Sequence, residues 1–246
     1  MSLKSKKLIQ ILIIIAGVFI VCGVIIFYMF QRKSEPAVTS ETTTETTSQE
    51  ETTVSPIDFQ TLWQTNDDIV AWIKIEGTNV DYPVLQSDED MEEDFYLNTT
   101  PEGASGYPGS IYIQKKNQGD FSDRVTALYG HNMANKTMFG SLHYFNDRTF
   151  FDTYNTIFVY TPEATLEYRV FAAYRSDNES IMINYDDFAS KTNLKEYLDF
   201  VSGLEESDIN HFNRNLEVTD DDRIILLTTC IGNPNYRWRV LGVLVE

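Results

Sequence analysis

The sequence predicts a mainly β protein: a closed eight-stranded β-barrel with helical insertions, preceded by one transmembrane helix. About eight short segments between residues 69 and 245 are rich in Val, Ile, Tyr and Phe, and most end at turn-forming residues. Few segments of this region carry apolar residues at helical spacing, and a barrel leaves such strands no open edge. The transmembrane helix is predicted by one long apolar run near the N-terminus, residues 8–30.

Composition and charge exclude several classes of protein. The 246 residues include 19 basic and 37 acidic side chains, giving a formal net charge of −18. Because nucleic-acid phosphates are bound by Lys and Arg, this balance excludes a nucleic-acid-binding protein. Cys22 and Cys230 are the two cysteines, and only Cys230 follows the apolar run. A disulfide-stapled domain and a zinc site built on several cysteines are therefore excluded as well.

The apolar run at residues 8–30 has Gln10 as its one strongly polar residue and reaches the roughly 20 residues that span a bilayer. A signal peptide has a shorter apolar region of about 7–15 residues, followed by a small-residue cleavage site. A lipoprotein anchor at Cys22 needs a small residue where Val21 stands. We therefore expect an uncleaved single-pass anchor in the cell membrane. Its lysine-rich flank, residues 1–7, favours a cytoplasmic N-terminus and an extracellular body.

The segment that follows the anchor, residues 31–55, is predicted to be a disordered stalk. Its main part, Ser34–Ser55, is rich in Thr and Glu and holds no aromatic and no basic residue. Such a segment cannot bury enough apolar surface to offset the entropy lost on ordering. The folded domain is therefore expected at residues 56–246.

Three helices are predicted in this domain. The first begins at Ser55, as the N-cap, with Pro56 in the first helical position. The second covers residues 137–145, where four apolar residues recur at helical spacing. The third covers residues 193–204, where the first residue and Glu196 resemble a capping box.

The predicted strands lie between and after these helices. Pro83 cannot donate a backbone hydrogen bond, so it favours an edge position or a strand end for the second strand. Residues 161–164 form a hairpin-like turn between the fifth and sixth strands. The predicted strands are 69–75, 80–84, 110–113, 125–129, 156–160, 166–174, 223–229 and 237–245.

Candidate chemistry begins at the ends of two strands. Cys230 ends an apolar strand beside a turn, and a free cysteine alone is most often a small buried hydrophobe. His131 follows another apolar strand and Gly130, where an imidazole is available as an acid or base near neutral pH. His143, in a helix, and His211, in a polar stretch, are interpreted as structural or surface residues.

Two arginines open the last strand. Arg237 and Arg239 follow Cys230 by seven and nine residues, and a hairpin brings the start of one strand back to the end of the previous one. An arginine beside the thiol favours the thiolate and can stabilise an oxyanion. Because residues two apart share a strand face, this pattern does not separate the two arginines.

These residues resemble a known family. Leu-Thr-Thr-Cys followed by Arg237 resembles the sortase signature, in which a Leu-x-Thr-Cys strand end precedes an arginine on the next strand. Three further segments are similar to class B sortases: Tyr-Gly-His-Asn-Met (129–133) with Met-Phe-Gly-Ser-Leu (138–142), Asp-Tyr-Pro-Val-Leu-Gln (81–86) and Phe-Tyr-Leu (95–97). The predicted helix at 193–204 fits the extra helix that class B sortases have between their sixth and seventh strands. Together, the resemblance covers residues 57–246.

The sequence departs from the family pattern at two points. Leu226 stands where the family usually has Thr, on the strand rather than at the thiol. The second arginine, Arg239, makes the assignment of the family's arginine ambiguous. Arg237 is chosen because Gly242 lies five residues later, where related sequences often have Gly or Ala.

The resemblance implies a sortase B-type cysteine transpeptidase that anchors surface proteins in a Gram-positive cell wall. Cys230 is expected to attack a sorting signal after Thr and form a thioester, with His131 as acid and base and Arg237 as oxyanion donor. Thr229 and Asn132, which flank these residues, are expected to bind substrate. The expected motif is Asn-Pro-x-Thr-x, the acceptor is an amine of peptidoglycan or its precursor, and no metal or organic cofactor is needed.

Two other functions fit the same residues. One is a cysteine endopeptidase that acts mainly as a hydrolase, because the same residues can transfer the acyl group to water in place of an amine. The other is a non-catalytic, membrane-tethered binding module that retains the barrel. The acidic runs at 88–94 and 220–222 could also bind calcium, but they lack the spacing and glycine of a dedicated calcium loop. A solvated charged face is the favoured interpretation of both runs.

Overall fold

The computed structural model describes residues 55–245. The predicted anchor at 8–30 and the predicted stalk, apart from its last residue, lie outside this range. No helix within residues 55–245 has the length and hydrophobicity needed to cross a membrane.

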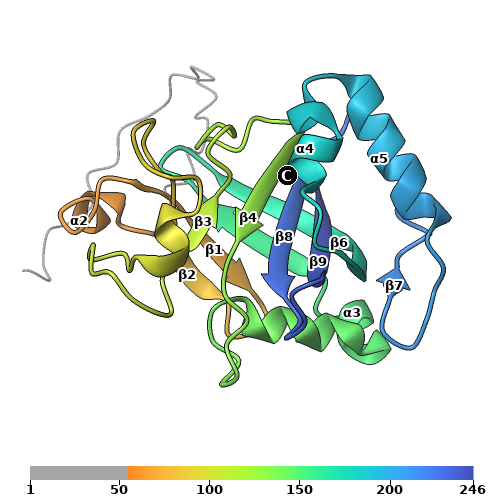
Figure 1. Cartoon of the computed structure of the whole chain (residues 1–246). Helices are drawn as coiled ribbons and strands as arrows, with labels where there is room; N and C mark the ends of the chain where they lie inside the picture. Colours follow the sequence, from red (N-terminus) through yellow and green to blue (C-terminus); the bar gives the residue numbers. More distant parts are fainter. Residues whose placement is uncertain (1–54, 246) are drawn as a thin grey trace, which may run out of the picture. The chain divides into compact units, whose positions relative to one another are not determined.

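The described residues form the predicted closed barrel (Figure 1). Hydrogen-bonded neighbours follow the order β5-β1-β2-β3-β4-β8-β9-β6, and pairing of β5 with β6 closes the ring. A ninth short strand, β7 (His211–Phe212), was not predicted and adds to β6 outside the ring. The eight barrel strands are β1 (Ile69–Ile75), β2 (Asp81–Leu85), β3 (Ile111–Ile113), β4 (Val125–Tyr129), β5 (Thr156–Tyr160), β6 (Thr165–Asp177), β8 (Ile224–Cys230) and β9 (Tyr236–Leu244).

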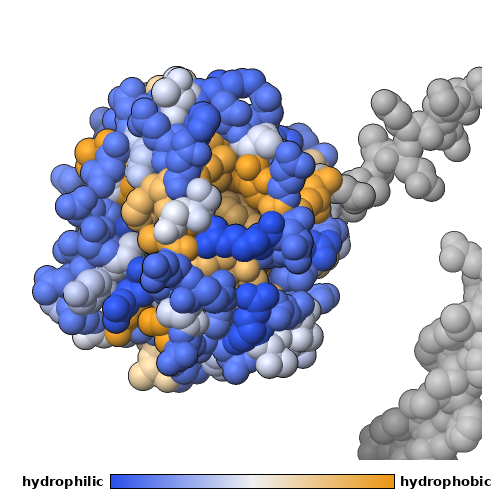
Figure 2. Space-filling view, turned by 90° about the vertical axis from the view of Figure 1, so that its right-hand side faces the viewer, coloured by the Kyte–Doolittle hydropathy of each residue, from blue (hydrophilic) through white to orange (hydrophobic). Residues whose placement is uncertain are grey.

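Strand β8 is apolar along its length because both of its faces are covered. Ile225 and Leu227 point into the barrel core, whereas Ile224 and Leu226 pack in a second cluster outside it. Helix α5 (Lys191–Gly203) covers that second cluster. Figure 2 looks at the side of the molecule that carries α5 and β7, and shows apolar side chains around a hollow in a largely hydrophilic surface. The first six residues of β8 are buried, and the last, Cys230, is exposed.

Of the two positions that Pro83 favoured for the second strand, an edge of the sheet or a strand end, the structure excludes the edge. The strand is not at an edge, because it pairs with β1 on one side and β3 on the other. On the β3 side, pairing involves only Val84 and Leu85. Pro83 precedes this paired part, where a missing N–H removes no bond to β3.

The three predicted helices are present, but each begins at a residue other than the predicted one. Helix α2 (Phe59–Leu62) has Asp58 rather than Ser55 as its N-cap, since the Asp58 carboxylate accepts a hydrogen bond from the backbone of Thr61 at 3.2 Å. Helix α5 is capped by Ser190, which forms a reciprocal capping box with Asn193. Asn193 is therefore in the first turn and is not the N-cap.

The predicted helix at 137–145 is a 3₁₀ helix, η2 (Phe139–Asn146), which begins later because Met138 has a positive φ of 52°. A short helix that was not predicted, α3 (Arg148–Thr153), follows it. The remaining short helices are η1 (Phe95–Asn98), α4 (Ile181–Asn184) and η3 (Asp186–Phe188). Helix α4 follows β6, whose last residue, Asp177, lies opposite Tyr236 at the start of β9.

Candidate active site

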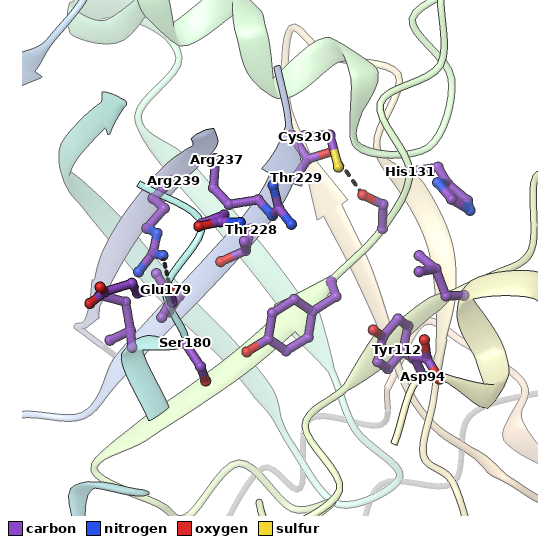
Figure 3. A pocket seen from close by; sticks show the side chains of 16 residues that line it. Asp94, Tyr112, His131, Glu179, Ser180, Thr228, Thr229, Cys230, Arg237 and Arg239 are labelled. Atoms are coloured by element: carbon purple, nitrogen blue, oxygen red, sulfur yellow. Dashed lines mark hydrogen bonds between the residues drawn. The ribbon is translucent and has the colours of Figure 1, made fainter. Parts of the chain in front are cut away.

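A pocket of about 280 Å³ opens at the end of β8 (Figure 3). Its walls come from the ends of β4, β8 and β9, from the segment around η1, and from the loop between β6 and α4. The lining residues are Asp94, Leu97, Tyr112, Tyr129, Gly130, His131, Asn178, Glu179, Ser180, Ile181, Leu226, Thr228, Thr229, Cys230, Arg237 and Arg239. The pocket therefore contains the predicted thiol, the predicted imidazole and both arginines.

Strand pairing explains why residues far apart in the sequence meet here. Strand β4 runs parallel to β8 with Tyr129 opposite Thr228, so the residues that follow both strands emerge at the same end of the barrel. Strand β9 runs antiparallel to β8 and places Arg237 opposite Cys230. Cys230 is exposed and carries a free thiol. A thiol at this place is accessible to a ligand in the pocket.

A buried hydrogen bond ties the cysteine strand to the histidine segment. The hydroxyl of Thr229 donates to the carbonyl of Gly130 at 2.8 Å. Gly130 is needed for close packing, because a Cβ there would lie 2.4 Å from Cδ1 of Ile111. Thr229 and Gly130 are the residues directly before Cys230 and His131, so this bond fixes the two segments relative to each other.

The His131 ring is partly buried and therefore partly desolvated. It packs against Tyr107, with ring centroids 4.6 Å apart, and Tyr107 itself is 63% exposed. Burial lowers the pKa of His131 below its usual value, and the nearby Leu97 carbonyl partly opposes this shift. Nε2 of His131 is buried without a hydrogen-bond partner among the described residues. The hydrogen-bonding capacity of this nitrogen is therefore unused within residues 55–245.

The two arginines, which the sequence pattern left equivalent, have different environments. Arg237 is half-buried beside Cys230, and its Nη1 donates to the carbonyls of Pro234 at 3.0 Å and Tyr236 at 2.9 Å. Arg239 lies opposite Thr228 and is only 2% exposed. The register therefore places Arg237, and not Arg239, directly across from the cysteine.

His143 was not predicted to contribute to this site. Its Nε2 lies 3.0 Å from the carbonyl oxygen of Cys230, and its ring stacks on Trp238 with centroids 5.6 Å apart. Burial lowers its pKa, and the bond to the Cys230 carbonyl opposes the shift. Because His143 is 87 residues from Cys230 in the chain, no local sequence pattern predicts this contact.

The other histidine has the structural position that the sequence predicted. His211 is buried on β7, with one ring nitrogen 3.0 Å from a carboxylate oxygen of Glu206 and the other 3.0 Å from the carbonyl of Asn146. It lies outside the pocket lined by Cys230.

The predicted substrate-binding residues differ in position. Thr229 lines the pocket but is 2% exposed, with its hydroxyl directed to Gly130. Asn132 is half-buried, forms an isolated β-bridge with Met138 and is not among the lining residues. Their roles in binding substrate stay predictions.

Residues 55–245 contain no group of three or more His, Cys, Asp or Glu side chains arranged to hold a metal ion. In the acidic run at 220–222, Asp221 pairs with Lys191, and Asp222 accepts hydrogen bonds from Thr219. The contacts of Thr219 with Asp222 hold the turn before β8, and the pair of Asp221 with Lys191 joins this turn to the start of α5.

Comparison with known proteins gives one family. The sortase domain profile matches residues 73–245. Sortase B of Listeria monocytogenes is 30% identical over 179 residues, which is 73% of this chain and 69% of that protein. Sortase B of Staphylococcus aureus is 31% identical over 172 residues, covering 70% of this chain and 67% of that protein. A structure of Staphylococcus aureus sortase B with substrate has a TM-score of 0.65 at 30% identity, covering 76% of this chain and 84% of that one.

Proposed function

Since this chain belongs to the sortase family and is a sortase B-type cysteine transpeptidase, we propose that it cuts a C-terminal sorting signal after Thr and joins the new acyl end to an amine of peptidoglycan or its precursor. The observation that carries this proposal is the position of Cys230. It is an exposed thiol in the pocket that His131 and Arg237 also line. The sequence we propose for the signal is of the Asn-Pro-x-Thr-x type.

In the first half of the reaction, Cys230 as thiolate attacks the carbonyl carbon of the signal's Thr. The carbonyl oxygen becomes an oxyanion, to which the Arg237 guanidinium donates hydrogen bonds across from the thiol. The C–N bond then breaks as His131 donates a proton to the departing amine. The products are a thioester on Cys230 and a free peptide with a new amino terminus.

In the second half, a cell-wall amine attacks the thioester carbonyl. His131, neutral after the first half, accepts a proton from the attacking nitrogen. The C–S bond breaks, an amide forms, and the thiolate of Cys230 returns. Water in place of the amine gives the hydrolase alternative with the same residues. The partly dry surroundings of His131 support transfer, because they limit the access of water.

We also propose the location that the N-terminal sequence predicts. Residues 8–30 anchor the protein in the cell membrane, residues 1–7 lie in the cytoplasm, and residues 31–55 hold the catalytic body outside the cell. Wall anchoring by a Gram-positive sortase requires this arrangement, because its peptidoglycan acceptor lies outside the membrane. Protease accessibility of the body in intact cells tests it.

The experiment that tests the reaction uses Cys230→Ala in the full chain, with Cys22→Ala as the matched control. A sorting peptide is incubated with and without an amine acceptor, and the products are identified by mass spectrometry. Cys230→Ala is expected to lose both cleavage and transfer, and Cys22→Ala to keep both. Residual turnover by Cys230→Ala would refute the thioester, and cleavage without transfer at any amine concentration would favour the hydrolase.

The role of Arg237 is tested by Arg237→Lys, which keeps the charge and loses the planar donor fork. Turnover is expected to fall on the order of 10²–10³-fold, as for loss of one oxyanion donor. Arg169→Lys, on β6 and paired with Glu167, is the matched control and retains turnover. A loss below tenfold for Arg237→Lys would move the oxyanion role to Arg239.

A further inference from the structure

His131 has a ring nitrogen that is closed off from water. Its Nε2 is buried and has no hydrogen-bond partner among the described residues. A buried polar atom without a partner is costly, because it has lost its bond to water and gained none in exchange. Proton exchange with an amine, the role proposed for His131, needs a nitrogen that the amine can reach. The side chains that cover this ring therefore decide which molecules reach it.

Tyr107 is the aromatic residue in contact with this imidazole. The two ring centroids are 4.6 Å apart, and the ring planes are inclined by 54°. Figure 3 shows His131 at one side of the pocket, with Cys230 between it and Arg239. His131 lines this pocket, whereas Tyr107 is not among the lining residues. Tyr107 therefore covers the His131 ring from outside the pocket.

The turn that carries Tyr107 is anchored at its ends. The backbone N–H of Gly106 donates to the carbonyl of Asn98 at 2.8 Å, and that of Gly109 donates to the carbonyl of Gly106 at 3.1 Å. A Cβ on Gly109 would lie 2.0 Å from the carbonyl oxygen of Leu97, so this glycine packs directly against η1. A Cβ on Gly106, by contrast, would meet no atom within 4 Å. The backbone of the turn is therefore held beside the imidazole, and the space next to Tyr107 is open.

The Tyr107 ring contributes little to the stability of the fold. It is 63% exposed, so it buries little apolar area. An exposed side chain changes rotamer within picoseconds to nanoseconds, so this ring can swing away from the imidazole. An acceptor amine held by binding contacts can displace such a ring, whereas a single water molecule gains no comparable contacts. The cover over His131 therefore discriminates between the two nucleophiles.

We propose that Tyr107 keeps water from His131 while the acyl group is held on Cys230, and gives way to the acceptor amine. Tyr107 thereby determines how much of the thioester is transferred and how much is hydrolysed. In hydrolysis, the oxygen of water attacks the thioester carbonyl and His131 accepts a proton from it. The C–S bond then breaks, which releases a carboxylic acid and restores the Cys230 thiolate. The inference rests on the proposed function, because it takes His131 to be the base that activates the nucleophile.

The experiment measures how fast the thioester decays in water. The full chain is acylated with an Asn-Pro-x-Thr-x peptide and then separated from it, with no amine present, and mass spectrometry of the intact protein follows the loss of the acyl group at pH 8. At this pH the imidazole is neutral in every variant, because its lowered pKa can rise only toward 6.5 when the ring is exposed. Differences in decay therefore report access of water and not protonation of His131.

Tyr107→Ala is expected to speed the decay at least fivefold, because water then reaches the base that activates it. Tyr107→Phe keeps the ring and is expected to stay within twofold of the wild type. Tyr154→Ala is the matched control: Tyr154 is 41% exposed and packs on Phe150 instead of on His131, so its loss leaves the decay unchanged. Damage to the site slows the decay of a thioester, so acceleration distinguishes shielding from a merely structural role.

An acceleration below fivefold in Tyr107→Ala, or a slower decay, would overturn the inference. Equal acceleration in Tyr107→Phe would do the same, because the ring would then not be the cover. If thermal melts show that Tyr107→Ala is unfolded, Tyr107→Leu decides instead. Its side chain is smaller than the tyrosine ring, so the decay has to be at least twofold faster than in the wild type, and a smaller change refutes the inference.

Chemical labelling separates failure of this inference from failure of the proposed reaction. Diethyl pyrocarbonate acylates neutral imidazoles, and peptide mass mapping distinguishes His131 from His143 and His211. At pH 8, His131 is expected to be labelled at least fivefold faster in Tyr107→Ala than in the wild type. Faster labelling in a protein whose wild type forms no thioester leaves the shielding by Tyr107 standing and refutes the reaction. A thioester that forms, together with equal labelling of the two proteins, supports the reaction and refutes the shielding.

Discussion

The hydrogen bond from Thr229 to Gly130 offers a test of how the site is held together. Thr229→Val removes the hydroxyl and keeps nearly the same shape. The buried carbonyl of Gly130 then loses a partner at 2.8 Å, which costs about 1–2 kcal/mol of unfolding free energy. For a domain of this size, each kcal/mol moves Tm by about 2–4 °C, so Tm is expected to fall by about 2–8 °C.

Thr126→Val is the matched control. Thr126 lies on β4, is 1% exposed, and its hydroxyl has no hydrogen-bond partner among the described residues. Removing an unpaired buried hydroxyl relieves a desolvation cost, so this variant is expected to be neutral or slightly stabilised. The two substitutions make the same chemical change on adjacent strands, and only the hydrogen bond distinguishes them.

Activity extends the test to the position of His131. Without the bond from Thr229, the segment that carries the imidazole is less well fixed, and kcat for a sorting peptide is expected to fall about 5- to 30-fold. Thr126→Val keeps kcat. Differential scanning calorimetry and steady-state kinetics measure both effects. Equal melting temperatures and equal kcat for the two variants would refute the idea that this bond positions the histidine.

Three further predictions follow from the same geometry. His143→Phe keeps the aromatic stack but loses the bond to the Cys230 carbonyl, so kcat should fall about 2- to 10-fold with KM unchanged, and a changed KM alone would contradict a positioning role. Tyr107→Ala admits water to the His131 ring, so the pKa of His131 should rise from its lowered value toward 6.5 and leave more imidazolium at neutral pH. The pKa is measured by NMR titration, and the absence of a rise would contradict desolvation as the cause of the lowered value. The body at residues 56–246 should fold and act without residues 1–55, and a chain that is unfolded by circular dichroism would place the boundary wrongly.

The local sequence pattern was sufficient to predict the strands β4 and β8 and to place His131 and Cys230 at their ends. The apolar runs before Gly130 and Cys230 are continuous because β4 and β8 are buried inside the sheet. Such runs identify strands without any knowledge of their neighbours. The turn-forming residues that follow each run then mark where the strand stops. The sequence therefore predicted that a thiol and an imidazole emerge at strand ends, and the family resemblance predicted that they meet.

Helix starts were predicted less well, because several residues compete as caps. Ser55 and Asp58 are both good N-caps, as are Ser190 and Asn193. The choice depends on which backbone N–H groups the packed helix leaves free. Asp58 and Ser190 were selected because the buried faces of α2 and α5 fix where each helix contacts the barrel.

The roles of the arginines and of His143 were decided only by tertiary structure. A side-chain period of two places Arg237 and Arg239 on one face, but only the β8–β9 register puts Arg237 opposite Cys230. Arg239 is buried because β6 and the loop before α4 fold over it. His143 reaches the Cys230 carbonyl because η2 packs against the ends of β8 and β9. A sequence determines which residues form a strand and which face they share, whereas contacts between distant segments exist only once the barrel has closed.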